Sequence, residues 1–277
     1  MRLVDSHCHI QAERFDTDTD LVLGAARLAG VERLLVPGWD RTSSERALAL
    51  ATRLPWLDAA VGVHPHDAAR VDDAAWSWFA DAARDPRVVA IGETGLDYDR
   101  AFSPIPDQLT NLRRNLALAL ATGKPAILHC RSAVGRRDAQ DALVGELRAA
   151  GFGGPAVAAF GGRPPAIVHS FSGPLDYAET MLDLGCAISF SGLVFRAGEE
   201  ASAAVASIVP ADRLLVETDS PYLSPPGAPR RRNEPSFVAI TAAWVAERRG
   251  VAPDTLGDDL VATYDTVLQR DAGLPRP

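Results

Sequence analysis

Short apolar runs alternate with longer amphipathic segments along almost the whole chain. The apolar runs have the length and composition of buried parallel strands. We predict eight of them, at residues 3–6, 31–36, 57–63, 88–91, 125–131, 166–169, 187–190 and 214–219. Each is followed by a segment with helical spacing, and these predicted helices cover residues 18–29, 43–53, 73–83, 107–122, 138–150, 175–184, 199–208 and 237–249.

This alternation is the pattern of a (β/α)8 barrel, the TIM barrel. A doubly wound open sheet would use the same alternation, but no G-x-G-x-x-G follows the first strand, and polar motifs end most of the strands. A closed barrel brings such strand ends around one mouth, so we favour it. We predict one domain over 1–277 with an extra C-terminal helix at 255–269, and Ser43 as the N-cap of the second helix.

Residues 151–165 are rich in glycine and proline and interrupt the regular spacing between the fifth helix and the sixth strand. A connection from a helix to the next strand lies on the face of a barrel opposite the catalytic mouth. We therefore expect a flexible surface loop without a role in catalysis.

Composition narrows the class of protein. The chain has 277 residues, 47% of them hydrophobic and 23% charged, which is ordinary for a globular protein. It shows neither a secretory leader pattern nor an apolar run long enough to cross a membrane. The cysteines Cys8, Cys130 and Cys186 lack CxxC spacing, which argues against a disulfide framework. We expect a cytoplasmic protein with no membrane partner and no obligate protein partner.

The net charge is −8. This balance argues against a broad surface that coats nucleic acid, since such a surface must displace counterions along the phosphate backbone. A local basic pocket remains open.

The candidate chemistry begins at His7 and His9, which end the first strand and project to the same side because side chains alternate with period two. One such pair is more often structural. Further histidines and carboxylates end other strands, however, and a barrel brings them together. The resulting set is His7, His9, Glu93, His129, His169 and Asp219.

Six ligands exceed the needs of one catalytic zinc, which uses three and keeps a position open. We therefore predict two divalent cations, with His7 and His9 on the first, His129 and His169 on the second, and Glu93 between them. Asp219 would bind the first cation and act as general base. Two cations about 4 Å apart would activate a water for hydrolysis. The imidazoles favour Zn, Mn, Fe or Co over Mg, which prefers oxygen ligands, but the residue types leave the element open among these five.

Alternation also suggests roles for the neighbours of this first pair. Asp5 lies on the same side as His7 and His9, and we expect it to orient one imidazole. Cys8 points the other way, toward the helices, and is not expected to bind metal.

The motifs DSHCH, GVHPH, GETGLDY, ILHCR, VHSFSG and ETDSPYL occur in this order within residues 3–240. Together they resemble the TatD family of metal-dependent deoxyribonucleases, within the amidohydrolase-like superfamily. The resemblance implies a TIM barrel with a divalent metal site that hydrolyses phosphodiester bonds, with DNA as substrate, either single-stranded or at 3′ ends. It places the metal ligands at His7, His9, Glu93, His129, His169 and Asp219, the set that the strand ends suggested.

The resemblance further implies that His64 is a substrate-side residue that contacts phosphate or assists catalysis, and that Glu217 is a buried support. Phosphotriesterase-like members of the superfamily use a carboxylated lysine at the end of the fourth strand. The only lysine here, Lys124, precedes the fifth strand, so chemistry that needs that bridge is not expected.

Arginines on the predicted mouth loops are candidates for phosphate binding, because guanidinium groups match phosphate oxygens. Arg131 is one. Arg136 and Arg137 fit solvated loop positions better. For the three arginines at 230–232, phosphate binding and a solvated loop position both stay open. Trp39 could stack a base, although packing is the commoner role for such an aromatic.

The leading hypothesis is thus a metal-dependent DNase. One alternative is a hydrolase that uses the same metals on a small ester, lactone or amide, or in deacylation. A metal-binding protein without catalysis is disfavoured, because Asp219 beside an open water position would then lack a purpose.

Overall fold

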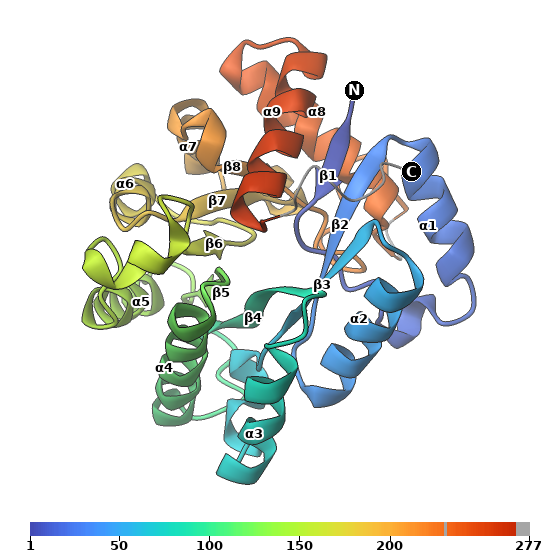
Figure 1. The fold of residues 1–277 in the computed structure, drawn as a ribbon. Coiled ribbons are helices and arrows are strands. Elements are labelled where there is room, and N and C mark those ends of the chain that lie inside the picture. Colours follow the sequence, from blue (N-terminus) through green and yellow to red (C-terminus); the bar gives the residue numbers. More distant parts are fainter. Residues whose placement is uncertain (230–231, 270–277) are drawn as a thin grey trace.

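Eight parallel strands form the centre of the molecule in a computed structural model that describes residues 1–229 and 232–269. Each strand pairs with the next along the chain (Figure 1). The strands are β1 (Leu3–Asp5), β2 (Val31–Pro37), β3 (Leu57–Val61), β4 (Val88–Asp97), β5 (Ala126–Arg131), β6 (Ala166–Val168), β7 (Ala187–Phe190) and β8 (Leu214–Val216).

Backbone hydrogen bonds close the sheet between its first and last strands. Ser6 N donates to Val216 O at 3.0 Å, and Asp219 N donates to His7 O at 2.9 Å. The predicted (β/α)8 barrel is confirmed, with helices around the outside of the strands (Figure 1). These helices are α1 (Thr19–Leu28), α2 (Arg41–Arg53), α3 (Asp73–Ala82), α4 (Ile105–Thr122), α5 (Asp138–Ala149), α6 (Leu175–Asp183), α7 (Ala201–Ile208), α8 (Val238–Arg249) and α9 (Pro253–Val267).

The α2 helix begins earlier than predicted. Its N-cap is Asp40, whose side chain accepts a hydrogen bond from Ser43 N at 2.7 Å, while Ser43 Oγ accepts one from Asp40 N at 2.9 Å. The assignment of Ser43 as N-cap was therefore wrong, because the hydroxyl closes a reciprocal capping box from the third helical position.

Helix α9 is the extra C-terminal helix. It passes over the N-terminal ends of the strands, where a Cβ at Gly257 would lie 2.5 Å from Arg2 O. The hydroxyl of Tyr264 donates to Asp58 on β3 at 2.9 Å. Among the described residues, we find no helix with the length and apolar character needed to cross a membrane.

The segment 151–165 is more ordered than the flexible loop expected from its glycine and proline content. It contains a short 3-10 helix, Pro155–Phe160, and the side chains of Phe152 and Phe160 are buried. Arg163 ties it to the N-terminal side of the barrel by donating to Gly123 O at 3.2 Å and Val267 O at 3.0 Å. Its position away from the mouth is as expected.

Strand β4 is the longest of the eight, and it packs unusually close to its neighbours. A Cβ at Gly95, where φ is 139°, would lie 1.9 Å from His129 O on β5. A Cβ at Gly62 would lie 2.4 Å from Gly92 Cα. Glycine is therefore needed here for close backbone approach, which places Glu93 between the ends of β3 and β5.

Candidate metal centre

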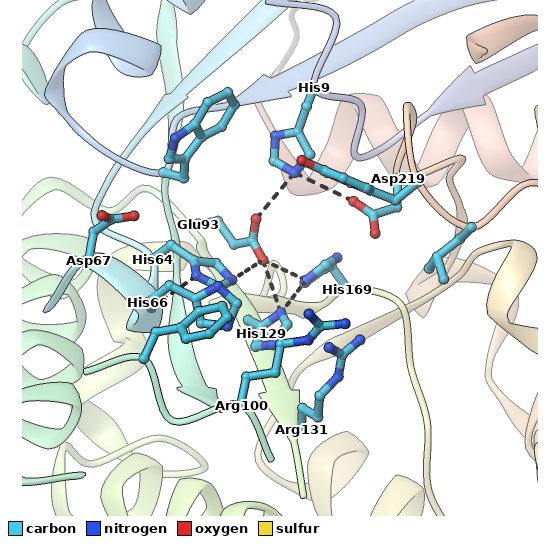
Figure 2. A pocket seen from close by; sticks show the side chains of 14 residues that line it. His9, His64, His66, Asp67, Glu93, Arg100, His129, Arg131, His169 and Asp219 are labelled. Atoms are coloured by element: carbon cyan, nitrogen blue, oxygen red, sulfur yellow. Dashed lines mark hydrogen bonds and ion pairs between the residues drawn. The ribbon is translucent and has the colours of Figure 1, made fainter. Parts of the chain in front are cut away.

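The predicted site residues all lie at the C-terminal ends of the strands and face one pocket of about 470 Å³ or lie directly beneath it (Figure 2). They come from six different strand ends, because parallel strands in a closed barrel finish around one mouth. The structure brings together all of the predicted side chains, namely His7, His9, His64, Glu93, His129, His169 and Asp219.

One oxygen of Glu93 faces the first pair of histidines. Glu93 Oε2 lies 3.2 Å from His7 Nε2 and 3.4 Å from His9 Nε2. Asp219 Oδ1 approaches the same two nitrogens, at 3.7 and 3.4 Å. Burial alone would lower the pKa of His9, but hydrogen bonds to Asp219 and Glu93 outweigh it and raise that pKa to about 9.

The other oxygen of Glu93 faces a second group of imidazoles. Glu93 Oε1 lies 2.9 Å from His169 Nε2, 3.1 Å from His129 Nδ1 and 3.3 Å from His64 Nε2. His129 Nδ1 and His169 Nε2 are themselves 3.3 Å apart. The carboxylate thus stands between two groups of nitrogen donors (Figure 2).

The groups of this cluster differ in their ionisation. Burial opposes the charge on Glu93, but nearby imidazoles, His169 first among them, hold its pKa well below the usual range. Burial and the neighbouring His169 lower the pKa of His7, and burial lowers that of His64 to about 4. The ionised Glu93 and the neutral rings of His7 and His64 offer lone pairs to a metal. For His9, His129 and His169 the neighbouring carboxylates outweigh burial and raise the pKa, so these rings must release a proton when they bind a cation.

The donor set fits divalent metal ions. His7 Nε2 and His9 Nε2 face each other at 3.1 Å, beside two carboxylates. Their nitrogens and oxygens are the ligand types of zinc and related transition metals. Three sets of donor atoms lie within 4.8 Å of one another, and these are His7 with His9 and Glu93, His7 with His169 and Asp219, and His64 with Glu93 and His129. The last set brings His64 nearer to the donors than the sequence suggested.

Two buried carboxylates contact imidazoles of this centre. Glu217 Oε1 lies 3.2 Å from His169 Nδ1 and accepts a hydrogen bond from Ser170 N at 2.7 Å. Asp97 Oδ2 lies 2.7 Å from His66 Nε2 and 3.5 Å from His129 Nε2.

Sequence reasoning missed Asp97, although a signal was present. Asp97 is on the same strand as Glu93, and alternation places both side chains on one face of β4.

Asp5 does not orient an imidazole, so that prediction was wrong. Its Oδ1 accepts from the backbone N of His7 at 3.3 Å and of Thr218 at 3.0 Å, and its Oδ2 accepts from Thr218 Oγ1 at 2.6 Å. His7 Nδ1 has no hydrogen-bond partner among the described residues. The carboxylate instead joins β1 to the end of β8. Cys8 lies apart from the donors, with Sγ 2.9 Å from Ser220 Oγ.

The arginines near the mouth fall into two kinds. Arg131 lines the pocket, and so does Arg100, which sequence reasoning did not single out. The other arginines predicted near the mouth are paired with carboxylates where the structure describes them, Arg136 with Asp138, Arg137 with Asp141 and Asp176, and Arg232 with Asp18 and Glu234. Arg230 and Arg231 lie outside the described residues. Trp39 also lines the pocket, with its ring 5.2 Å from that of His9.

Comparison with known proteins identifies the family. The family model described as "TatD related DNase" matches residues 4–269. The chain is 36% identical over 245 residues to a Bacillus subtilis protein named "Uncharacterized metal-dependent hydrolase YabD", with 88% of this chain and 90% of that protein covered. It is 36% identical over 264 residues to an Erwinia billingiae protein named "3'-5' ssDNA/RNA exonuclease TatD", with coverage of 92% and 94%.

A solved structure agrees with these relatives. The TatD homologue YJJV from Escherichia coli K12 superposes with a TM-score of 0.84 at 30% identity, and the match covers 98% of this chain and 99% of that one. The fold, the cluster of donors around Glu93 and the sequence relationship agree, and the chain belongs to the TatD-related DNase family of metal-dependent hydrolases.

Proposed function

We propose that this enzyme hydrolyses phosphodiester bonds in DNA by means of two divalent cations, and that it acts on single strands or 3′ ends. The observation that carries the proposal is the position of Glu93, whose two oxygens face two separate groups of imidazoles. A bridging carboxylate between two donor groups is the arrangement expected of a two-metal hydrolase. The exonuclease named TatD from Erwinia billingiae supports the choice of substrate.

The proposed ligands follow from the distances. His7, His9 and Asp219 would hold the first cation, and His129 and His169 the second, with Glu93 shared. The imidazoles favour zinc, manganese, cobalt or iron, whereas magnesium would rely on the carboxylates.

Two cations held there would supply Lewis acidity for the phosphoryl oxygen and hydroxide at neutral pH. Asp219 accepts the proton of the attacking water, because its carboxylate is ionised and borders the pocket. It presents Oδ1 to His9, and among the described residues its Oδ2 makes no hydrogen bond. Burial lowers the pKa of His64 to about 4, so the ring is neutral and can donate one hydrogen bond to a phosphate oxygen.

The test is hydrolysis by metal-free protein reloaded with each cation in turn. Substrates are single-stranded DNA labelled at its 5′ end, the matching duplex, RNA, and a panel of small esters and lactones. We expect shortening of single-stranded DNA from its 3′ end, and loss of it in Asp219→Ala. Arg137→Gln is the matched control, since Arg137 is engaged by Asp141 and Asp176 and does not line the pocket.

If DNA stays intact with every cation while a small ester is hydrolysed, and Asp219→Ala stops that hydrolysis, the proposed substrate is wrong. If no substrate is hydrolysed and metal analysis finds no bound cation, the two-metal assignment is wrong as well.

A further inference from the structure

Two aromatic side chains stand exposed at the pocket that contains Glu93. Phe102 is 67% exposed and Tyr222 is 53% exposed, and both line the pocket. Single exposed apolar residues are common on protein surfaces and need no explanation. These two differ because they border a charged, concave site, where an exposed ring can serve as a surface for a ligand.

The two rings lie on different sides of the metal centre. The ring of Phe102 is 4.7 Å from that of His66, which bonds to Asp97 beside His129. The ring of Tyr222 is 6.1 Å from that of His9, in the first donor group.

Each ring meets its neighbouring imidazole edge-to-face, at interplanar angles of 73° and 70°. The exposed fractions of 67% for Phe102 and 53% for Tyr222 leave ring surface that a base can contact.

Backbone hydrogen bonds fix the loops that carry these rings. Tyr222 N donates to Asp219 O at 2.9 Å, and Asn233 Nδ2 donates to Tyr222 O at 2.7 Å. Next to Phe102, Ser103 Oγ donates to His66 O at 2.8 Å. Loops held in this way lose little backbone freedom when a ligand stacks on their rings, which favours binding.

Two arginines add positive charge on the side of Phe102. Arg100 and Arg131 both line the pocket, and Figure 2 shows their side chains near His129. Arg131 Nη1 lies 3.9 Å from Asp97 Oδ2, and the guanidinium of Arg100 makes no ion pair among the described residues. Both can therefore meet phosphate oxygens.

We propose that Phe102 and Tyr222 stack two unpaired bases, one on each side of the phosphate to be cleaved, while Arg100 and Arg131 contact a neighbouring phosphate. This inference rests on the proposed nuclease function and assigns its preference for single strands to these residues. A base inside a duplex has both faces covered by its neighbours, so only an unpaired end can stack on the rings. Stacking of a base on an aromatic side chain tolerates any sequence.

The test compares 5′-labelled single strands that end in natural nucleotides with strands whose last two 3′ nucleotides lack a base. We expect the wild-type enzyme to cleave the natural end faster, by about 5-fold to 100-fold. Phe102→Ala and Tyr222→Ala should each reduce this ratio and leave cleavage of the abasic end unchanged. Phe102→Trp and Tyr222→Phe should restore the ratio. Val134→Ala is the control, because Val134 is fully exposed on the β5–α5 connection and does not line the pocket.

If the alanine variants cleave natural and abasic ends more slowly by the same factor, the rings have a structural role and the proposal is overturned. An unchanged ratio would also overturn it. A DNA-binding assay distinguishes failure of the stacking proposal from failure of the nuclease function. Asp219→Asn protein, which keeps an oxygen ligand but lacks the general base, should bind a natural single strand more tightly than an abasic one, by fluorescence anisotropy, even if the wild type cleaves nothing. Equal binding of both strands would refute the base contacts.

Discussion

Asp97→Asn tests whether the carboxylate beside His129 in the second donor group helps to hold a metal. The substitution keeps the size of the side chain and removes its charge. Asp97 Oδ1 accepts from Asp99 N at 3.1 Å and from Arg100 N at 2.8 Å, and an amide oxygen can keep both bonds. In place of Oδ2 the asparagine would then carry an NH2 group, which is a donor and faces the ring nitrogens of His66 and His129.

The substitution changes two contacts between Asp97 and imidazole rings. His66 Nε2 lies 2.7 Å from Asp97 Oδ2, and His129 Nε2 lies 3.5 Å from it. When His129 presents Nδ1 to a metal, its Nε2 carries the proton and points at Asp97. Loss of such a partner typically weakens metal binding about 10-fold to 100-fold, which corresponds to about 1.4 to 2.7 kcal/mol.

The assay is a zinc titration of metal-free protein in competition with a fluorescent chelator, with thermal unfolding of the metal-free protein as a second measurement. Asp99→Asn is the matched control, since it removes the same charge from an exposed residue two positions away. Unchanged zinc affinity in a folded Asp97→Asn protein would refute the reasoning, and would leave Asp97 only the task of holding the backbone of Asp99 and Arg100.

Three further outcomes follow from the structure. Reloading metal-free protein with zinc at about 100 times its Kd should stabilise it by about 2.7 kcal/mol, and an unchanged melting temperature in calorimetry would contradict this. Gly95→Ala should not fold, because its Cβ would lie 1.9 Å from His129 O; a native circular dichroism spectrum would disprove the close approach. Lys124 Nζ donates to Ala83 O at 2.6 Å and to Asp85 O at 3.0 Å. Lys124→Met should therefore cost about 1 to 3 kcal/mol in urea unfolding and leave zinc affinity unchanged, whereas lower zinc affinity would place Lys124 at the site.

The barrel and the donor cluster could be predicted because both depend on simple periodicities. Parallel strands in a closed barrel end at one mouth, and alternation fixes which side chains face it. His7 and His9 project together for this reason, and Glu93 and His129 join them from β4 and β5. No knowledge of loop conformation was needed for any of these positions.

Residues whose role depends on loop conformation could not be predicted in this way. Arg100 and Phe102 lie on the connection after β4, and no local pattern tells where such a loop will place a side chain. Asp5 shows a second limit. Alternation gives the side of the strand to which a carboxylate points. It does not tell whether the carboxylate will reach the ring or the backbone N–H of the residue two positions on, and Asp5 accepts from the backbone N–H of His7.

The proposed bridging group, Glu93, separates this site from that of phosphotriesterase-like enzymes with a carboxylated lysine. A lysine bridge forms only after reaction with carbon dioxide, whereas Glu93 is a carboxylate from the start and its pKa is held well below the usual range. Lys124 cannot take over the bridge. Its Nζ donates to two backbone carbonyls on the connection between α3 and β4, on the opposite side of the barrel from the pocket. Assembly of the proposed two-cation centre would therefore depend on the cations and on the position of β4, and not on bicarbonate.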